Sequence, residues 1–163
     1  MKLSKKVTLI GPFGVGKTSL FRRYIDDAFS EDYKSTLGVQ IQKKVITMPN
    51  GVELSLILWD TEGHMEISEG RTAYLMGSHT FIYVFDLTRI DTYKNINTQL
   101  TFLKENFPNV PVKVIGNKLD TVFKTKVQET LKEENVKFDF LTSAKTGEAV
   151  ENLFNEIASE LTN

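Results

Sequence analysis

A glycine-rich segment near the start of the chain, Gly11 to Thr18, has the pattern G-x-x-x-x-G-K-[ST]. Glycines at this spacing let the backbone turn tightly, so that its N–H groups converge on phosphate oxygens. Lys17 can neutralise charge on the β- and γ-phosphates, and the Thr18 hydroxyl can bind Mg²⁺. A glycine-rich turn with an unrelated lysine is the alternative. The segment lies between a predicted strand and a predicted helix, which favours a nucleoside triphosphate site without indicating the base.

A second motif, Asn117-Lys118-Leu119-Asp120, also follows a predicted strand. A buried Asp120 can accept hydrogen bonds from the ring N–H and the exocyclic amine of guanine, and adenine lacks that pair of donors. The stem of Lys118 can lie along the base, while Asn117 braces neighbouring loops. The tetrapeptide alone is better explained as a polar turn, but its place at a strand end in a chain with a glycine-rich phosphate motif favours guanine binding. An ATP-dependent enzyme such as a small kinase leaves it unexplained.

The segment Thr142-Ser143-Ala144-Lys145 follows the last predicted strand. The backbone N–H of Ala144 can bond the guanine oxygen, and Lys145 can cover the base. A helix-entry turn with a surface lysine explains these residues equally well, so both interpretations stay open at this point.

Alternating strands and helices must position these motifs. Strands are predicted at 3–10, 38–48, 52–59, 79–87, 112–115 and 137–141, and helices at 17–26, 91–107, 124–135 and 147–161. Pro49-Asn50-Gly51 predicts one hairpin. The pattern predicts an α/β fold with a mostly parallel six-stranded sheet, one antiparallel hairpin strand and helices on both faces. The motifs then fall at the carboxyl ends of strands, where such sheets bind ligands.

Length and composition narrow the class of protein. The chain has 163 residues, which fits one domain spanning 1–163. Its formal net charge of -1 offers no overall basic field for nucleic acid. No run approaches the roughly 20 apolar residues of a membrane span. The absence of cysteine excludes disulfides and, in this chain, a prenyl anchor. We expect a cytoplasmic protein.

Together with Ser35-Thr36-Leu37-Gly38-Val39 and Trp59-Asp60-Thr61-Glu62-Gly63-His64, these motifs resemble small GTPases of the Ras superfamily, which are P-loop NTPases. The residues of the motifs at 35–39 and 59–63 are most similar to those of the Rab branch. The resemblance implies GTP and GDP as ligands, with Mg²⁺ held by Thr18, Thr36 and Asp60. It implies catalytic roles for His64, Lys17, Thr36 and Gly63. The nucleotide-binding residues implied by the motifs and the resemblance are Phe13, Gly14, Val15, Gly16, Lys17, Thr18, Ser19, Phe29, Tyr33, Thr36, Gly63, Asn117, Lys118, Asp120, Ser143, Ala144 and Lys145.

The resemblance also implies a mechanism and partners. The γ-phosphate and Mg²⁺ order two switch segments, the first containing Thr36 and the second containing Asp60 and Gly63. Hydrolysis releases both segments. An effector, an exchange factor and an activating protein are expected at these segments. Tyr74, Ile67 and Trp59 are candidates for an apolar docking patch or for core positions, and Arg71 is expected to be structural or to face a partner.

Three departures from the family pattern bear on hydrolysis. His64 replaces the usual water-orienting glutamine, and it either orients the water or has no catalytic task. Phe13 stands where the Ras branch has glycine, so its ring either crowds the γ-phosphate or shields the nucleotide. Glu62 and Met65 replace the usual alanine and glutamate. We expect a molecular switch that hydrolyses GTP slowly; the alternative is a hydrolysis-deficient, GTP-bound scaffold.

Overall fold

The computed structural model describes residues 1–30, 38–61 and 72–163. Several predicted functional residues therefore lie outside the described residues: Tyr33, Ser35, Thr36, Leu37, Glu62, Gly63, His64, Met65, Ile67 and Arg71.

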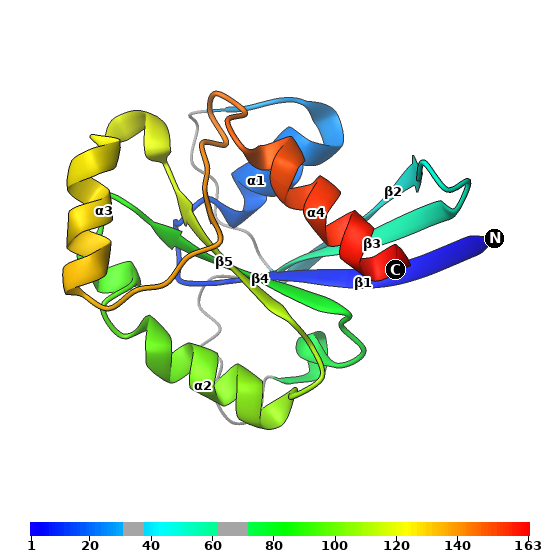
Figure 1. Cartoon of the computed structure of the whole chain (residues 1–163), viewed down its shortest axis with the longest axis horizontal. Coiled ribbons are helices and arrows are strands. Elements are labelled where there is room, and N and C mark those ends of the chain that lie inside the picture. Colours follow the sequence, from blue (N-terminus) through cyan, green and yellow to red (C-terminus); the bar gives the residue numbers. More distant parts are fainter. Residues whose placement is uncertain (31–37, 62–71) are drawn as a thin grey trace.

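Six strands and four α-helices make up the described fold (Figure 1). The strands are β1 (Lys2–Ile10), β2 (Val39–Thr47), β3 (Glu53–Thr61), β4 (Thr80–Asp86), β5 (Val112–Asn117) and β6 (Phe140–Leu141). The α-helices are α1 (Lys17–Asp26), α2 (Ile96–Asn106), α3 (Lys124–Glu133) and α4 (Val150–Thr162), and short 3-10 helices span η1 (Thr72–Leu75), η2 (Ile90–Thr92) and η3 (Leu119–Thr121). None of these helices in the described ranges is long and apolar enough to cross a bilayer.

The sheet has the strand order β2-β3-β1-β4-β5-β6. Only the β2–β3 pair is antiparallel, and the other four pairs are parallel. The hairpin turn carries Gly51 at a φ of 80°, in the left-handed region that glycine tolerates. The predicted fold class, with one antiparallel strand on an otherwise parallel sheet, is confirmed.

Two hydrophobic cores cover the two faces of this sheet. On one face, α1 and α4 pack on alternate residues of the central strands, and the Tyr24 and Phe154 rings stack at 3.8 Å. On the other face, α2 and α3 pack on the intervening residues, including Phe81 and Phe85 of β4. All seven residues of β4 are buried, as expected for a strand enclosed on both sides (Figure 1). The two cores hold the sheet, and with it the site at its carboxyl edge.

Several predicted elements differ from the structure. The strands predicted at 52–59 and 112–115 end two residues later, at Thr61 and Asn117. The helix predicted at 91–107 begins only at Ile96, because Thr92 closes a tight turn by bonding backbone atoms of Asp86 and Arg89. The helix predicted at 147–161 begins at Val150, after residues in the left-handed region. The helix predicted at 124–135 ends at Glu133. The last strand is shortened to Phe140–Leu141.

Candidate functional site

The carboxyl ends of adjacent strands bring the predicted motifs together. Strand β1 runs directly into the glycine-rich loop, and Leu9 lies in register with Asp60 on β3. Asp86 at the end of β4 lies in register with Asn117 at the end of β5. The phosphate loop (residues 11–18), the metal candidate Asp60 and the base-reading motif (residues 117–120) therefore share one edge of the sheet, although Gly14 of the loop and Lys118 of the motif are 104 residues apart in sequence.

Two glycines let the loop lie close to the sheet. A Cβ at Gly11, whose φ is 144°, would lie 2.1 Å from the backbone oxygen of Val84. A Cβ at Gly16, whose φ is 101°, would lie 2.3 Å from the amide nitrogen of Asn117. Real side chains do not approach so closely, so any larger residue would push the loop away from the strand ends. The motif glycines are thus required by contact with β4 and β5.

Lys17, the motif lysine, is folded inside the loop. Its Nζ donates to the carbonyls of Gly11 and Pro12, each at 2.8 Å, and the residue is 6% exposed. Burial lowers the pKa of Lys17 to about 8; the charge of Asp60 opposes this shift and that of Arg89 reinforces it. The ammonium is therefore positioned by the loop but incompletely compensated by protein, which suits it to an anionic ligand.

Thr18 and Asp60, the two described metal candidates, touch each other. The Thr18 hydroxyl donates to Asp60 Oδ2 at 2.6 Å. Asp60 is fully buried, and its other oxygen, Oδ1, has no hydrogen-bond partner among the described residues. Burial raises the pKa of Asp60, while the bond from Thr18 and the charge of Lys17 offset part of the rise. A buried carboxylate oxygen without a partner, beside a hydroxyl, is a suitable ligand pair for a hard cation such as Mg²⁺.

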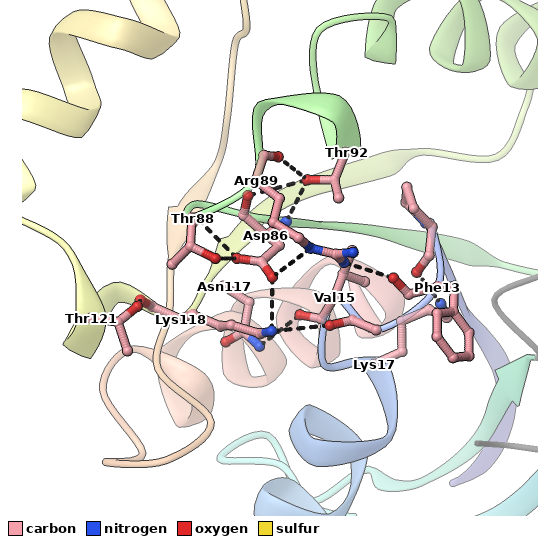
Figure 2. A network of polar contacts seen from close by, with 12 residues as sticks. Phe13, Val15, Lys17, Asp86, Thr88, Arg89, Thr92, Asn117, Lys118 and Thr121 are labelled. Atoms are coloured by element: carbon pink, nitrogen blue, oxygen red, sulfur yellow. Dashed lines mark hydrogen bonds and ion pairs between the residues drawn. The ribbon is translucent and has the colours of Figure 1, made fainter. Parts of the chain in front are cut away.

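Asp86 is a second fully buried carboxylate at this edge, and the sequence analysis did not identify it. It accepts bonds from both the backbone N–H and the hydroxyl of Thr88, at 2.8 and 2.6 Å. Its Oδ2 lies 2.7 Å from Lys118 Nζ and 3.1 Å from Arg89 Nε. Burial alone would raise the pKa of Asp86, but the bonds from Lys118 and Thr88 outweigh it and hold the pKa below its ordinary value. Asp86 thus binds the charged groups of both Lys118 and Arg89 (Figure 2).

The side chains of Lys118 and Arg89, which both contact Asp86, also bond to the phosphate loop. Lys118 Nζ donates to the Gly14 carbonyl at 3.0 Å, and Arg89 Nη2 donates to the Phe13 carbonyl at 2.7 Å (Figure 2). The head group of Lys118 is thereby fixed, and its 38% exposed side chain leaves part of the stem accessible to a base. No motif contains Arg89; its place two residues after a buried strand, next to a threonine turn, was the only signal in the sequence.

Asn117 braces the neighbouring loops, as predicted. Its amide nitrogen donates to the Val15 carbonyl at 3.1 Å. Its Oδ1 accepts from the Thr142 hydroxyl at 3.1 Å and from the Ala144 N–H at 3.2 Å. One side chain, 2% exposed, thus joins the phosphate loop to the loop after β6. The Ala144 N–H, which we expected to face guanine, is here bonded to Asn117 instead.

Asp120 lies at the rim of this site. The interpretation of the sequence supposed that a buried Asp120 meets the base, and in the described structure the residue is exposed. It sits in the short η3 turn rather than beneath a packed element, and Ser143, which is fully buried, donates to its Oδ1 at 2.7 Å. The carboxylate is therefore oriented by a buried hydroxyl while its remaining acceptor positions stay accessible.

Arg23 on α1 holds the loop after β6 and was also missed by the sequence analysis. Its Nε donates to the Ala144 carbonyl at 2.8 Å and its Nη2 to the Lys145 carbonyl at 2.6 Å. Its Nη1 contacts the Asp27 carboxylate at 3.0 Å. The Thr142–Lys145 segment is therefore fixed to both α1 and β5, which favours a binding loop over a simple helix-entry turn.

The other predicted residues are distributed around this centre. Val15 is fully buried and Ser19 is partly buried in the first turn of α1. Phe13 and Phe29 are each 36% exposed. Of the proposed apolar patch, Tyr74 is 36% exposed, whereas the Trp59 ring lies under Lys6 Nζ, 3.7 Å from the ring centroid. Trp59 is thus partly buried within its own chain.

The strand order, the glycine loop with its internal lysine and the helix beginning directly after it define a P-loop nucleotide-binding α/β protein. The model of the Ras family matches residues 6–163. The Ras-related protein Rab-13 of the dog is 34% identical over 162 residues, covering 96% of this chain and 79% of the relative. The Ypt/Rab-type GTPase YPT7 of Saccharomyces cerevisiae is 33% identical over 164 residues, covering 94% and 79%. The chain belongs to the Ras family, and its predicted similarity to the Rab branch is confirmed.

Membership of this family defines the activity. The protein is a guanine-nucleotide-binding molecular switch and GTPase that binds GTP and GDP with Mg²⁺. The described residues fit these ligands: Thr18 and Asp60 would hold the metal ion, and Lys17 would meet the phosphates. The bound Mg²⁺ supplies positive charge to the phosphate oxygens during hydrolysis.

Proposed function

We propose that this chain is a slow switch, which remains in its GTP-bound form until an activating protein completes its catalytic site. The observation that supports this proposal concerns Phe13. Arg89 bonds to its carbonyl at 2.7 Å, which fixes the backbone of this residue in the phosphate loop, and the residue is 36% exposed. A bulky ring at this position of the loop restricts the space in which the attacking water reaches the γ-phosphate.

His64 is our candidate for orienting the attacking water. Imidazole can accept a proton from water or hold it by a hydrogen bond. Lys17 would stabilise negative charge that develops on the phosphates, and Thr36 and Gly63 complete the proposed catalytic set. We place the protein in the cytoplasm, where its guanine nucleotides are available.

The partners that we propose are an effector, an exchange factor and an activating protein that contact the two switch segments. Support comes from β2, which is the edge strand of the sheet next to the first switch segment. Ile41 and Val45 on this strand are 51% and 50% exposed. Exposed apolar residues on a sheet edge are suited to a protein partner.

Single-turnover hydrolysis of preloaded GTP tests the slow-switch proposal. We expect slow turnover in the native chain and an increase of roughly tenfold or more in His64→Gln or Phe13→Gly. The matched control is His79→Gln, because His79 is the chain's other histidine and accepts a bond from the Lys6 N–H on β1. Rapid native hydrolysis that His64→Ala abolishes would overturn the proposal. No hydrolysis in any variant would favour a GTP-bound scaffold.

A further inference from the structure

Three consecutive carbonyls of the phosphate loop are each held by a side chain from another part of the chain. Arg89 holds the carbonyl of Phe13, Lys118 that of Gly14 and Asn117 that of Val15. Two of these side chains belong to the base-reading motif, whereas Arg89 comes from the turn after β4 and has no place in any motif.

The direction of these bonds determines where the loop's N–H groups point. In a trans peptide, the carbonyl and the following N–H point in opposite directions, and this chain has no cis peptide bond among its described residues. Arg89 and Lys118 meet on the same oxygen of Asp86, so they approach the loop from one side (Figure 2). The N–H groups of Gly14 and Val15 must therefore point away from Asp86.

These N–H groups are also available to a ligand. Within the described part of the chain, the N–H groups of Gly14, Val15 and Gly16 donate no hydrogen bond to the protein. Gly14 and Gly16 have φ values of 72° and 101°, and left-handed residues in such a turn allow successive N–H groups to converge into an anion-binding concavity. The phosphate site thus depends on carbonyls being held on its outer side.

We propose that Arg89 is a phosphate-positioning residue: by holding the Phe13 carbonyl, it fixes the Phe13–Gly14 peptide with its N–H toward the nucleotide phosphates. The bond has the strength for this role, because it is short and its donor is a charged guanidinium. Asp86 fixes the guanidinium in turn, through a fully buried carboxylate. The guanidinium also adds positive charge beside Lys17, although it makes its contact on the far side of the peptide from the ligand.

The test uses the whole chain with GDP and Mg²⁺, and compares Arg89→Ala with Lys94→Ala. Lys94 is exposed and lies five residues further along the same segment, so this control removes an equal charge. We expect GDP release from Arg89→Ala to be faster by roughly tenfold to a hundredfold, the usual consequence of losing a hydrogen bond to a charged group. Lys94→Ala should release GDP at the wild-type rate.

The NMR chemical shifts of the loop's amide protons distinguish this specific role from a general destabilisation of the loop. On GDP binding, the amide protons of Gly14 and Val15 should both shift downfield in the wild type. Arg89→Ala should lose the shift at Gly14 and keep it at Val15, whose peptide is held by Lys118. Arg89→Lys, which retains a charged donor, should recover part of the Gly14 shift.

Three results would overturn the inference: GDP release from Arg89→Ala at the wild-type rate, equal loss of both amide shifts, or loss of the Val15 shift alone. If Arg89→Ala does not fold, Arg89→Met keeps the aliphatic stem without the donors and is judged by the same criteria. The inference rests on nucleotide binding, which the wild-type chain tests separately. Failure of wild type to bind GDP would contradict the nucleotide site itself, whereas a variant effect confined to Val15 would contradict only the role of Arg89.

Discussion

Lys17 carries its charge in surroundings that oppose it. The side chain is almost completely buried, and its two hydrogen bonds go to neutral carbonyls rather than to a carboxylate. Burial therefore lowers its pKa to about 8, and the nearby Arg89 adds to the effect. A phosphate anion supplies the missing negative charge, so binding and protonation of Lys17 must favour each other.

Proton uptake should accompany GDP binding in mildly alkaline solution. Near pH 8 about half of the free Lys17 side chains are neutral, and bound phosphate raises the pKa and returns the proton. The affinity for GDP should thus fall as the pH rises above about 8. Calorimetry in two buffers with different ionisation enthalpies measures the uptake directly, and we expect about half a proton at pH 8. A binding enthalpy that is independent of the buffer at this pH would contradict the prediction.

At the scale of elements, α1 contributes more than its N-terminus to the site. Its first turn follows the phosphate loop, and one and a half turns later Arg23 holds the carbonyls of Ala144 and Lys145. The helix therefore connects the phosphate end of the site to the base end. Since the planar guanidinium bonds two consecutive carbonyls at once, a lysine cannot replace it.

Arg23→Lys should weaken GDP binding and speed GDP release by roughly tenfold, because the loop after β6 loses one of its two anchors. Arg23→Ala should do at least as much. The loss should be specific for the base end: pyrophosphate, which lacks a base, should bind Arg23→Lys and wild type alike in a competition assay. A parallel loss of pyrophosphate binding would show instead that α1 as a whole had shifted.

The sequence predicted those elements whose signals are local. The fully apolar β4, the glycine loop and the amphipathic pattern of α4 each follow from neighbouring residues. The start of α2 was predicted five residues too early, because the prediction followed the apolar spacing and not the weak helix propensity of Asp91, Thr92 and Asn95. Thr92 instead closes a turn on Asp86, and this turn keeps these residues out of the helix.

The same division holds for the candidate site. Lys17, Thr18 and Asn117 were predicted because their spacing is fixed within short motifs. Arg23 and Arg89 were not, because each acts on a carbonyl more than 70 residues away in sequence and a carbonyl leaves no mark in the sequence. The exposure of Asp120 could not be predicted either, since it depends on how the turn after β5 projects from the sheet.

The whole molecule places two fully buried aspartates at one edge of its sheet, with opposite consequences. Asp86 at the end of β4 is bonded by Thr88, Arg89 and Lys118, and its pKa is held below the ordinary value. Asp60 near the end of β3 has one oxygen with no partner among the residues that the structure describes, and its pKa is raised, chiefly by burial. One carboxylate is stabilised by the fold itself, and the other is stabilised fully only when a cation joins it.

Replacing each aspartate by asparagine should therefore change stability in opposite directions. Because the folded-state pKa of Asp60 is raised, its ionised form destabilises the fold at neutral pH, and this cost disappears as the pH falls through that pKa. Because the pKa of Asp86 is lowered, its ionised form stabilises the fold at neutral pH, and this contribution is lost under acidic conditions. Without nucleotide or metal, Asp60→Asn should raise Tm by a few degrees, and Asp86→Asn should lower it.

Mg²⁺ should reverse the difference in Tm between Asp60→Asn and the wild type. In the presence of GDP, adding Mg²⁺ should raise the Tm of the wild type and of Asp86→Asn, because a ligand of the folded state stabilises it. Asp60→Asn should gain little from the ion, because its buried carboxylate ligand is gone. Thermal unfolding with GDP in excess Mg²⁺ and in EDTA measures both effects. An equal Mg²⁺-dependent rise in Asp60→Asn and wild type would mean that the oxygen of Asp60 left without a partner is not a place for the metal.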